Sequence, residues 1–145
     1  MATKTTLPSL DDIKRTWYVV DADGKPLGRL AVKIANLLRG RNKPIFTNHI
    51  DTGDFVIVTN ARTVKLTGTK DDQKVYHRFT GFRSGNKDTA VALVRERHAE
   101  RMVEHAVKGM LPRNTMSRTV IKRLKVYAGA DHPHAAQTPK TIKLD

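Results

Sequence analysis

Two short apolar segments of the chain flank a stretch with the periodicity of an amphipathic helix. Residues 16–20 and 55–58 are unbroken apolar, aromatic and β-branched runs, a pattern typical of strands covered on both faces. Between them, apolar residues recur three and four positions apart, as on one helical face; they are Leu27, Leu30, Ala31, Ile34, Leu37 and Leu38. Gly40 and Pro44 follow and predict the end of that helix. This order predicts a parallel βαβ unit with a right-handed crossover, and therefore an α/β fold.

Short β structure is expected next. The apolar residues Val64 and Leu66, and then Val75 and Tyr76, predict short strands or a hairpin. Residues 80–87 contain two glycines together with Arg83 and Lys87, which predicts a basic loop.

The second half of the chain predicts helices. Asp88 is a candidate N-cap of a helix that reaches Val94. A clean apolar stripe follows up to the break at Pro112; its positions are Ala99, Met102, Val103, Ala106, Val107 and Met110. A last short helix is predicted over 116–124, after which 126–127 return to the sheet.

Length and composition narrow the class of protein. The 145 residues are expected to form a single domain, 1–145. Residues 1–13 form its N-terminal arm, and residues 129–145 are expected to lie extended over the surface as a C-terminal tail. The chain has no cysteine, which excludes disulfides and thiolate metal sites. No apolar run has the length of a membrane span, and the N-terminus lacks the pattern of a signal or transit peptide. We therefore expect a cytoplasmic protein without a membrane partner.

The distribution of charge gives the strongest indication of a binding partner. The chain has 27 Lys and Arg against 14 Asp and Glu, a formal net charge of +13. The basic residues are grouped, because no acid lies between Asp23 and Asp51 or from His105 to Ala130. Grouped, uncompensated positive charge is the electrostatic footprint of nucleic-acid binding. A solvated basic surface and a membrane-surface protein are the alternatives that charge alone leaves open.

The candidate RNA contacts lie in the two acid-free segments and in the 80–87 loop. Arg can bind a phosphate with two hydrogen bonds, whereas Lys acts as a point charge. The candidates are Arg29, Arg39, Arg41, Lys43, Arg83, Lys87, Lys108, Arg113, Asn114, Arg118, Lys122, Arg123 and Lys125. Arg118, Lys122 and Lys125 are expected to share one side of the last predicted helix. The alternative is a solvated helix face, and Glu104, one turn before Lys108, could neutralise that lysine.

Catalytic and metal chemistry find little support. His132 and His134, beside Asp131, could be drawn as a metal site, but the sequence places no third ligand. The serines are Ser9, Ser84 and Ser117, and none lies in a Gly-x-Ser-x-Gly motif. We therefore expect no catalytic residue, no metal, no cofactor and no small-molecule substrate.

Several motifs together resemble the bacterial-type ribosomal protein L13 family over nearly the whole chain. They are residues 17–22 with 27–31, 51–54 with 60–61, 74–76 with 80–81, 107–112 with 125–129, and 132–137. The resemblance implies a three-layer α/β/α fold around a small, mostly parallel central sheet of about four strands, with extended basic loops. Phe79 and Ser84 depart from the family, in which His and Gly are common, as does Ser117 where Gly is common.

The resemblance also implies a function. It implies a structural constituent of the large ribosomal subunit, located in cytoplasmic ribosomes, with a role early in subunit assembly and no enzymatic activity. Its partners would be large-subunit rRNA and neighbouring large-subunit ribosomal proteins. A free RNA-binding translational regulator and a small metal-dependent nuclease are the alternatives. Co-sedimentation with the large subunit would distinguish a ribosomal protein from a free regulator. Hydrolysis of RNA with and without a chelator tests whether the protein is a metal-dependent nuclease.

Overall fold

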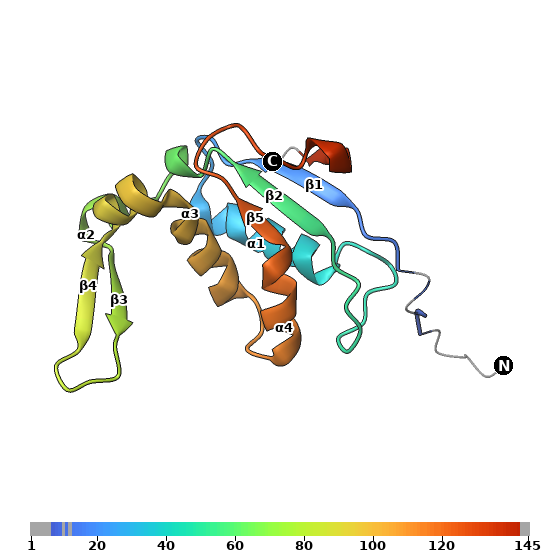
Figure 1. Ribbon diagram of the computed structural model, residues 1–145, viewed down its shortest axis with the longest axis horizontal. Helices are drawn as coiled ribbons and strands as arrows, with labels where there is room; N and C mark the ends of the chain where they lie inside the picture. The colour runs from blue at the N-terminus through green and yellow to red at the C-terminus, as the bar shows by residue number, and fades with distance from the viewer. Residues whose placement is uncertain (1–6, 10, 12, 143–145) are drawn as a thin grey trace.

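The computed structural model describes residues 7–9, 11 and 13–142. Its main sheet has the strand order β5-β2-β1-β6, formed by β1 (Trp17–Asp21), β2 (Phe55–Thr59), β5 (Leu124–Val126) and β6 (Lys140–Ile142). Each neighbouring pair is parallel, with Val19 opposite Ile57 and Ile57 opposite Lys125. Figure 1 shows α1 (Leu27–Arg39) behind this sheet. The predicted βαβ unit is therefore confirmed.

Helix α1 forms where its apolar stripe predicts it. Leu30, Ile34 and Leu38 are at most 1% exposed and lie in the main core. The helix ends at Gly40, which adopts a left-handed φ of 73° and donates its N–H to the Leu37 carbonyl. A side chain at Gly40 would collide with Thr52, because an added Cβ would lie 2.5 Å from the Thr52 hydroxyl oxygen.

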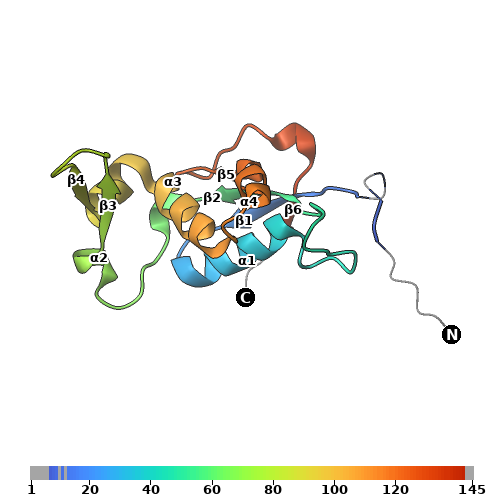
Figure 2. The same cartoon turned by 90° about the horizontal axis from the view of Figure 1, so that it is seen from below.

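Other parts of the chain pack against both faces of the sheet, but they cover one face more completely than the other. On one face Val20, Val56 and Val58 join α1 and α3 (Val91–Met110) in the main core. On the other face Trp17 stacks on Phe55 with ring centroids 4.3 Å apart. Figure 2 shows α1 on one side of the sheet and the short turn η3 (Ala135–Gln137) on the opposite side. The expected three-layer α/β/α arrangement is therefore present, with a thin second cover.

The thin cover leaves β1 incompletely buried. Trp17, Tyr18 and Val19 are partly exposed, and Val20 is the fully buried residue of this strand. This strand is covered on both faces as predicted, but the cover is incomplete on the side of Trp17 and Val19. Strand β2 fits the prediction better, because Val56, Ile57 and Val58 are 0% exposed.

A separate antiparallel hairpin extends away from the main sheet (Figure 1). It consists of β3 (Val75–Phe79) and β4 (Asn86–Ala90) and follows the short helix α2 (Lys70–Gln73). This confirms the expected strand at 75–76. The strand expected around Val64 and Leu66 is instead a 3-10 turn, η1 (Ala61–Thr63), followed by an isolated bridge between Pro26 and Lys65.

The start of α3 differs from the prediction. Asp88 lies in β4, where its Oδ1 is 2.7 Å from His77 Nδ1 and accepts a 2.9 Å hydrogen bond from Asn86. It is therefore no helix cap, and α3 begins at Val91, two residues later than a cap at Asp88 predicts. The helix has a kink at His98, where φ is −148° and ψ is 65°.

The predicted last helix is shorter than expected. Residues 115–123 form α4 (Thr115–Val120) and the 3-10 turn η2 (Ile121–Arg123), and β5 then begins at Leu124. Lys125 therefore lies in a strand and does not share a helix face with Arg118 and Lys122. The expected return to the sheet is confirmed at Val126.

The C-terminal tail is more than a surface extension. After η3 it forms β6, which pairs with β1 through Tyr18 opposite Lys140 and Val20 opposite Ile142. The prediction of a tail laid over the surface is therefore corrected, because the tail adds an edge strand. Most of the N-terminal arm, at 1–6, 10 and 12, and the last residues 143–145 lie outside the described residues.

Candidate nucleic-acid interface

The junction between α3 and α4 forms a groove with a basic rim. Leu111 is 5% exposed and anchors the junction in the core, while Pro112 follows the end of α3. Asn114 caps α4, because its side-chain oxygen accepts a 2.8 Å hydrogen bond from the Ser117 N–H. We call this the α3–α4 groove; its lining residues are His105, Lys108, Gly109, Leu111, Pro112, Arg113, Asn114, Ser117, Arg118 and Ile121.

The cations at this groove are available to a ligand. Lys108, Arg113 and Arg118 line the groove and are exposed, and Lys122 lies exposed one turn beyond Arg118. Among the residues that the structure describes, no acid forms an ion pair with any of these four, and Glu104 leaves Lys108 unneutralised. Three uncompensated cations that line one concave surface, with a fourth next to it, favour an anionic ligand with repeated charges.

A further groove lies on the other side of α4 and includes part of the first acid-free segment. The guanidinium of Arg39 lies over the Phe46 ring, 5.6 Å from its centroid. The lining residues of this groove are Arg39, Phe46, Thr47, Asn48, Ile50, Asp51, Pro112, Asn114, Met116, Ser117 and Val120. Pro112, Asn114 and Ser117 line both grooves. The fold therefore brings the two acid-free segments together around α4.

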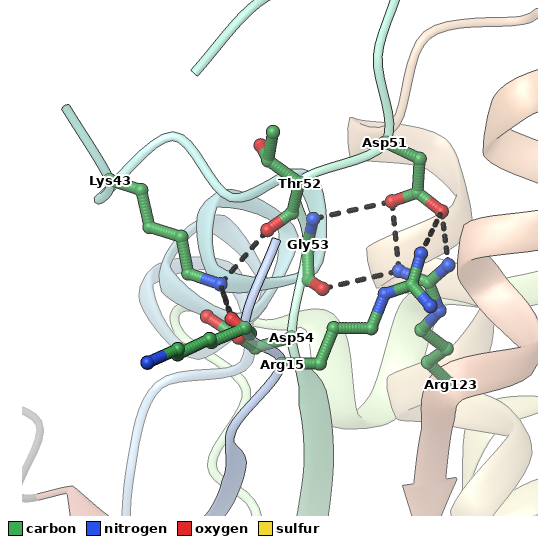
Figure 3. Close-up of polar contacts among 8 residues, drawn as sticks. Arg15, Lys43, Asp51, Thr52, Gly53, Asp54 and Arg123 are labelled. Atoms are coloured by element: carbon green, nitrogen blue, oxygen red, sulfur yellow. Dashed lines mark hydrogen bonds and ion pairs between the residues drawn. The ribbon is translucent and has the colours of Figure 1, made fainter. Parts of the chain in front are cut away.

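Lys43 points toward Thr52 and Asp54, as Figure 3 shows, and its side chain is 16% exposed. Its Nζ donates to Asp54 Oδ1 at 2.6 Å and to the carbonyls of Thr52 at 3.0 Å and Lys14 at 2.9 Å. Asp54 is 0% exposed and also accepts a 2.9 Å hydrogen bond from the Thr16 N–H. A buried carboxylate requires such partners. Lys43 therefore fastens the loop after α1 to the segment before β1.

Arg123 has a similar internal role. Its guanidinium forms a two-pronged ion pair with Asp51, and its Nη1 also donates to the Gly53 carbonyl at 3.2 Å (Figure 3). The side chains of Arg123 and Asp51 are 11% and 23% exposed. Arg15 approaches the same carboxylate, with an N–O distance of 3.8 Å. Arg123 thus ties the end of η2 to the loop before β2 and positions the segment that carries the exposed cations.

The other predicted contacts lie outside the α3–α4 groove. Arg29 is exposed on α1, and Arg41 is exposed just after its end. Arg83 is exposed at the tip of the hairpin, and Lys87 is exposed in β4. Lys125 is half-buried in β5, an edge strand of the main sheet. The structure therefore brings Arg39 to α4, but it distributes these five over other surfaces.

Sequence reasoning missed a further group of basic side chains, on an exposed side of α3. Arg97, Arg101 and His105 are exposed; Arg101 and His105 share one helix face, and Arg97 lies just before the kink at His98. Glu96, Glu100 and Glu104 lie among them in the sequence, so these basic residues do not form an acid-free segment. With the hairpin they form a groove lined by Tyr76, His77, Arg78, Thr89, Leu93, Val94, Arg97, His98, Arg101 and His105. His105 lines both this groove and the α3–α4 groove.

Two groups outside the α3–α4 groove have shifted pKa values. Burial raises the pKa of Tyr76, and the positive charge of Arg95 opposes part of that shift. The hydrogen bond from the Asn60 side chain lowers the pKa of Asp21, the backbone N–H of Asp23 adds to the shift, and burial opposes it.

The part of the chain that the structure describes contains no candidate metal site. No group of three or more histidine or acidic side chains there could hold a metal ion. His134 instead lies 2.8 Å from the Tyr127 hydroxyl through its Nε2 and contacts the Trp17 ring at 5.2 Å. This histidine therefore anchors the tail to the sheet.

None of the described helices has the length and apolar character needed to cross a membrane.

Comparison with known proteins adds independent evidence. Residues 15–133 match the model of the family described as ribosomal protein L13. The chain is 53% identical to the large ribosomal subunit protein uL13 of Synechococcus sp. (strain CC9311), over 98% of this chain and 95% of the relative. It is 57% identical to the protein of the same name in Prochlorococcus marinus (strain MIT 9301), over 94% and 95%. The chain belongs to the ribosomal protein L13 family.

Proposed function

We propose that this protein is a structural constituent of the large ribosomal subunit that binds large-subunit rRNA. The observation that carries the proposal is the α3–α4 groove, where Lys108, Arg113 and Arg118 are exposed and unneutralised by described acids. Phosphate contacts supply most of the affinity in such interfaces, and fixed cations on a rigid platform provide them. The protein's work is to hold RNA in place, and it is not an enzyme.

The proposed RNA-facing set is narrower than the set of predicted cations. Lys43 and Arg123 support the platform from inside, since their charges are paired with Asp54 and Asp51. Asn114 combines its capping role with a place on the rim of both grooves beside α4. The proposed contacts are Arg29, Arg39, Arg41, Arg83, Lys87, Lys108, Arg113, Asn114, Arg118, Lys122 and Lys125.

The proposed place of action is the ribosome in the cytoplasm, next to other large-subunit proteins. Membership of the L13 family supports this, as does the name of its relatives, large ribosomal subunit protein uL13. Cations spread over α1, the hairpin and α4 would let one small protein contact several rRNA segments. Such a protein can join segments while the subunit is still being assembled, which is the proposed role in early assembly.

Binding to large-subunit rRNA at increasing salt tests the proposal. With about six to ten phosphate contacts, affinity should fall about a thousandfold or more between about 50 and 200 mM salt. The protein should also remain with the large subunit through sedimentation after a moderate-salt wash. A salt slope near zero, or release from the subunit together with tight binding to a messenger, would overturn the proposed function.

A further inference from the structure

The tip of the β3–β4 hairpin exposes two large aromatic rings. Phe79 is 70% exposed and Phe82 is 77% exposed. The other large apolar residues found exposed among the described residues range from 36% to 57%. Both rings lie on the hairpin that extends away from the main sheet in Figure 1, so the core does not cover them. Two neighbouring exposed rings on a projecting arm indicate a surface that a partner covers.

Charge at the hairpin identifies the kind of partner. No acid occurs from Gln73 to Lys87, and Arg78, Arg83 and Lys87 are exposed on the same hairpin. Arg78 and Lys87 pair across the strands on the face opposite Phe79, whereas Arg83 directly follows Phe82 in the loop. Rings interleaved with cations are typical of proteins that stack unpaired bases and hold the adjoining phosphates. A protein partner would require an acidic surface to match these charges. An RNA strand supplies both the bases and the negative charge.

The loop between the two strands is built to hold its shape. The Thr80 N–H donates to the Gly85 carbonyl at 3.0 Å, and the Gly85 N–H donates to the Phe82 carbonyl at 2.9 Å. Gly85 is closely surrounded, because an added Cβ would lie 2.1 Å from the Thr80 hydroxyl oxygen. Gly81 and Ser84 adopt left-handed φ values of 90° and 59°. A loop ordered in this way loses little conformational freedom when Phe82 meets a ligand.

We infer that Phe79 and Phe82 each stack on an unpaired base of rRNA, while Arg83 binds a phosphate beside those bases and Arg78 and Lys87 add positive charge from the other face of the hairpin. The inference rests on the proposed function and adds to it a site for single-stranded RNA at the hairpin tip. It differs from the α3–α4 groove, whose named contacts are cations and one amide. Each ring should contribute about 5- to 150-fold to affinity for an RNA that contains the site.

The first test compares Phe79→Leu and Phe82→Leu with the parent protein in binding to protein-free large-subunit rRNA. Leucine keeps an apolar side chain but removes the aromatic face, so each variant should bind more weakly by the factor given above. Val32→Ala is the matched control, because Val32 is 48% exposed on α1 and is expected to leave binding unchanged. Thermal unfolding of each variant checks that the fold is retained.

The second test detects stacking directly. Phe82→Trp places an indole at the tip, and its fluorescence should be quenched when rRNA binds, beyond any change of Trp17 in the parent. Val32→Trp should show no such quenching. If Phe82→Leu binds as the parent does and Phe82→Trp is not quenched, the stacking site is wrong while the proposed function stands. If the Leu variants bind rRNA normally but fail to enter subunits, the rings contact a protein, which also overturns the inference. Failure of the parent to bind rRNA would instead overturn the proposed function itself.

Discussion

Individual basic residues of this chain have two different tasks. Lys43 and Arg123 are largely buried and paired with Asp54 and Asp51, whereas Arg113 is exposed at the rim of a groove. The sequence cannot separate these tasks, because Arg123 meets an acid 72 positions away in the chain. A Lys or Arg in an acid-free segment can still be neutralised when the fold brings an acid to it. The cations that remain uncompensated are therefore identified by structure.

Lys43→Met should destabilise the protein strongly. The substitution would leave the fully buried Asp54 carboxylate without its cation, and removing one partner of a buried pair costs about 3–5 kcal/mol. Arg41→Met is the matched control, because it removes the same charge two positions earlier from an exposed side chain and should change stability by at most about 0.5 kcal/mol. Urea unfolding of both variants measures the difference. Equal midpoints would show that Lys43 does not fasten the loop.

Asp21 should contribute stability that depends on pH. The Asn60 hydrogen bond lowers the pKa of Asp21 in the folded state, so the contribution is present above the unfolded-state value, about 3.9, and is lost as pH falls through the lower folded value. Asp21→Asn should therefore lower the urea midpoint at pH 7, and the difference from the parent should shrink toward pH 3. A difference that stays constant with pH would assign the effect to something other than the carboxylate charge.

At the scale of elements, long apolar patterns are predictable and short polar strands are not. Helix α1 has an apolar stripe of several turns, and β2 is a continuous apolar run, so their local patterns suffice. Strand β6 is Lys140-Thr141-Ile142 and forms because β1 offers a free edge. Strand β4 contains Asn, Lys, Asp and Thr, and β3 supplies its pairing. Such strands depend on a neighbour that the local sequence does not reveal.

The two-faced burial of β2 can be tested at Ile57. This residue is 0% exposed at the centre of the strand, paired with Val19 and Lys125 on either side. Ile57→Ala should lower the free energy of unfolding by about 2–5 kcal/mol through lost burial and a cavity. Val32→Ala on the exposed face of α1 provides the comparison and should have little effect. If the Ile57 variant melts like the parent, the side of the sheet opposite α1 contributes little to stability.

At the scale of the whole molecule, the fold gathers charge that the sequence leaves in separate places. The segment from 108 to 122 is basic in the sequence itself, so its importance could be predicted without a structure. Arg39 and Asn114 line one groove beside α4 although they are far apart in the sequence, and this could not be predicted in the same way. The alignment of Arg97, Arg101 and His105 with the hairpin likewise needs the packing of β3 and β4 against α3. The site is therefore partly local in sequence and partly a product of tertiary structure.

The central claim is that contacts at the α3–α4 groove bind rRNA, and not net charge alone. Long-range effects of charge are largely screened beyond about 8 Å at physiological ionic strength, whereas direct contacts are screened less. Two triple variants separate these effects because both lose the same charge. One variant replaces Arg113, Arg118 and Lys122 with glutamine. The other replaces the exposed Lys14, Lys65 and Lys140 with glutamine.

The decisive measurement is competition between each triple variant and the parent protein for incorporation into reconstituted large ribosomal subunits. The groove variant should be incorporated far less than the parent, because it loses short-range phosphate contacts. The variant at Lys14, Lys65 and Lys140 should compete nearly as well as the parent. Equal incorporation of the two variants would contradict the account and attribute binding to the general charge of the protein.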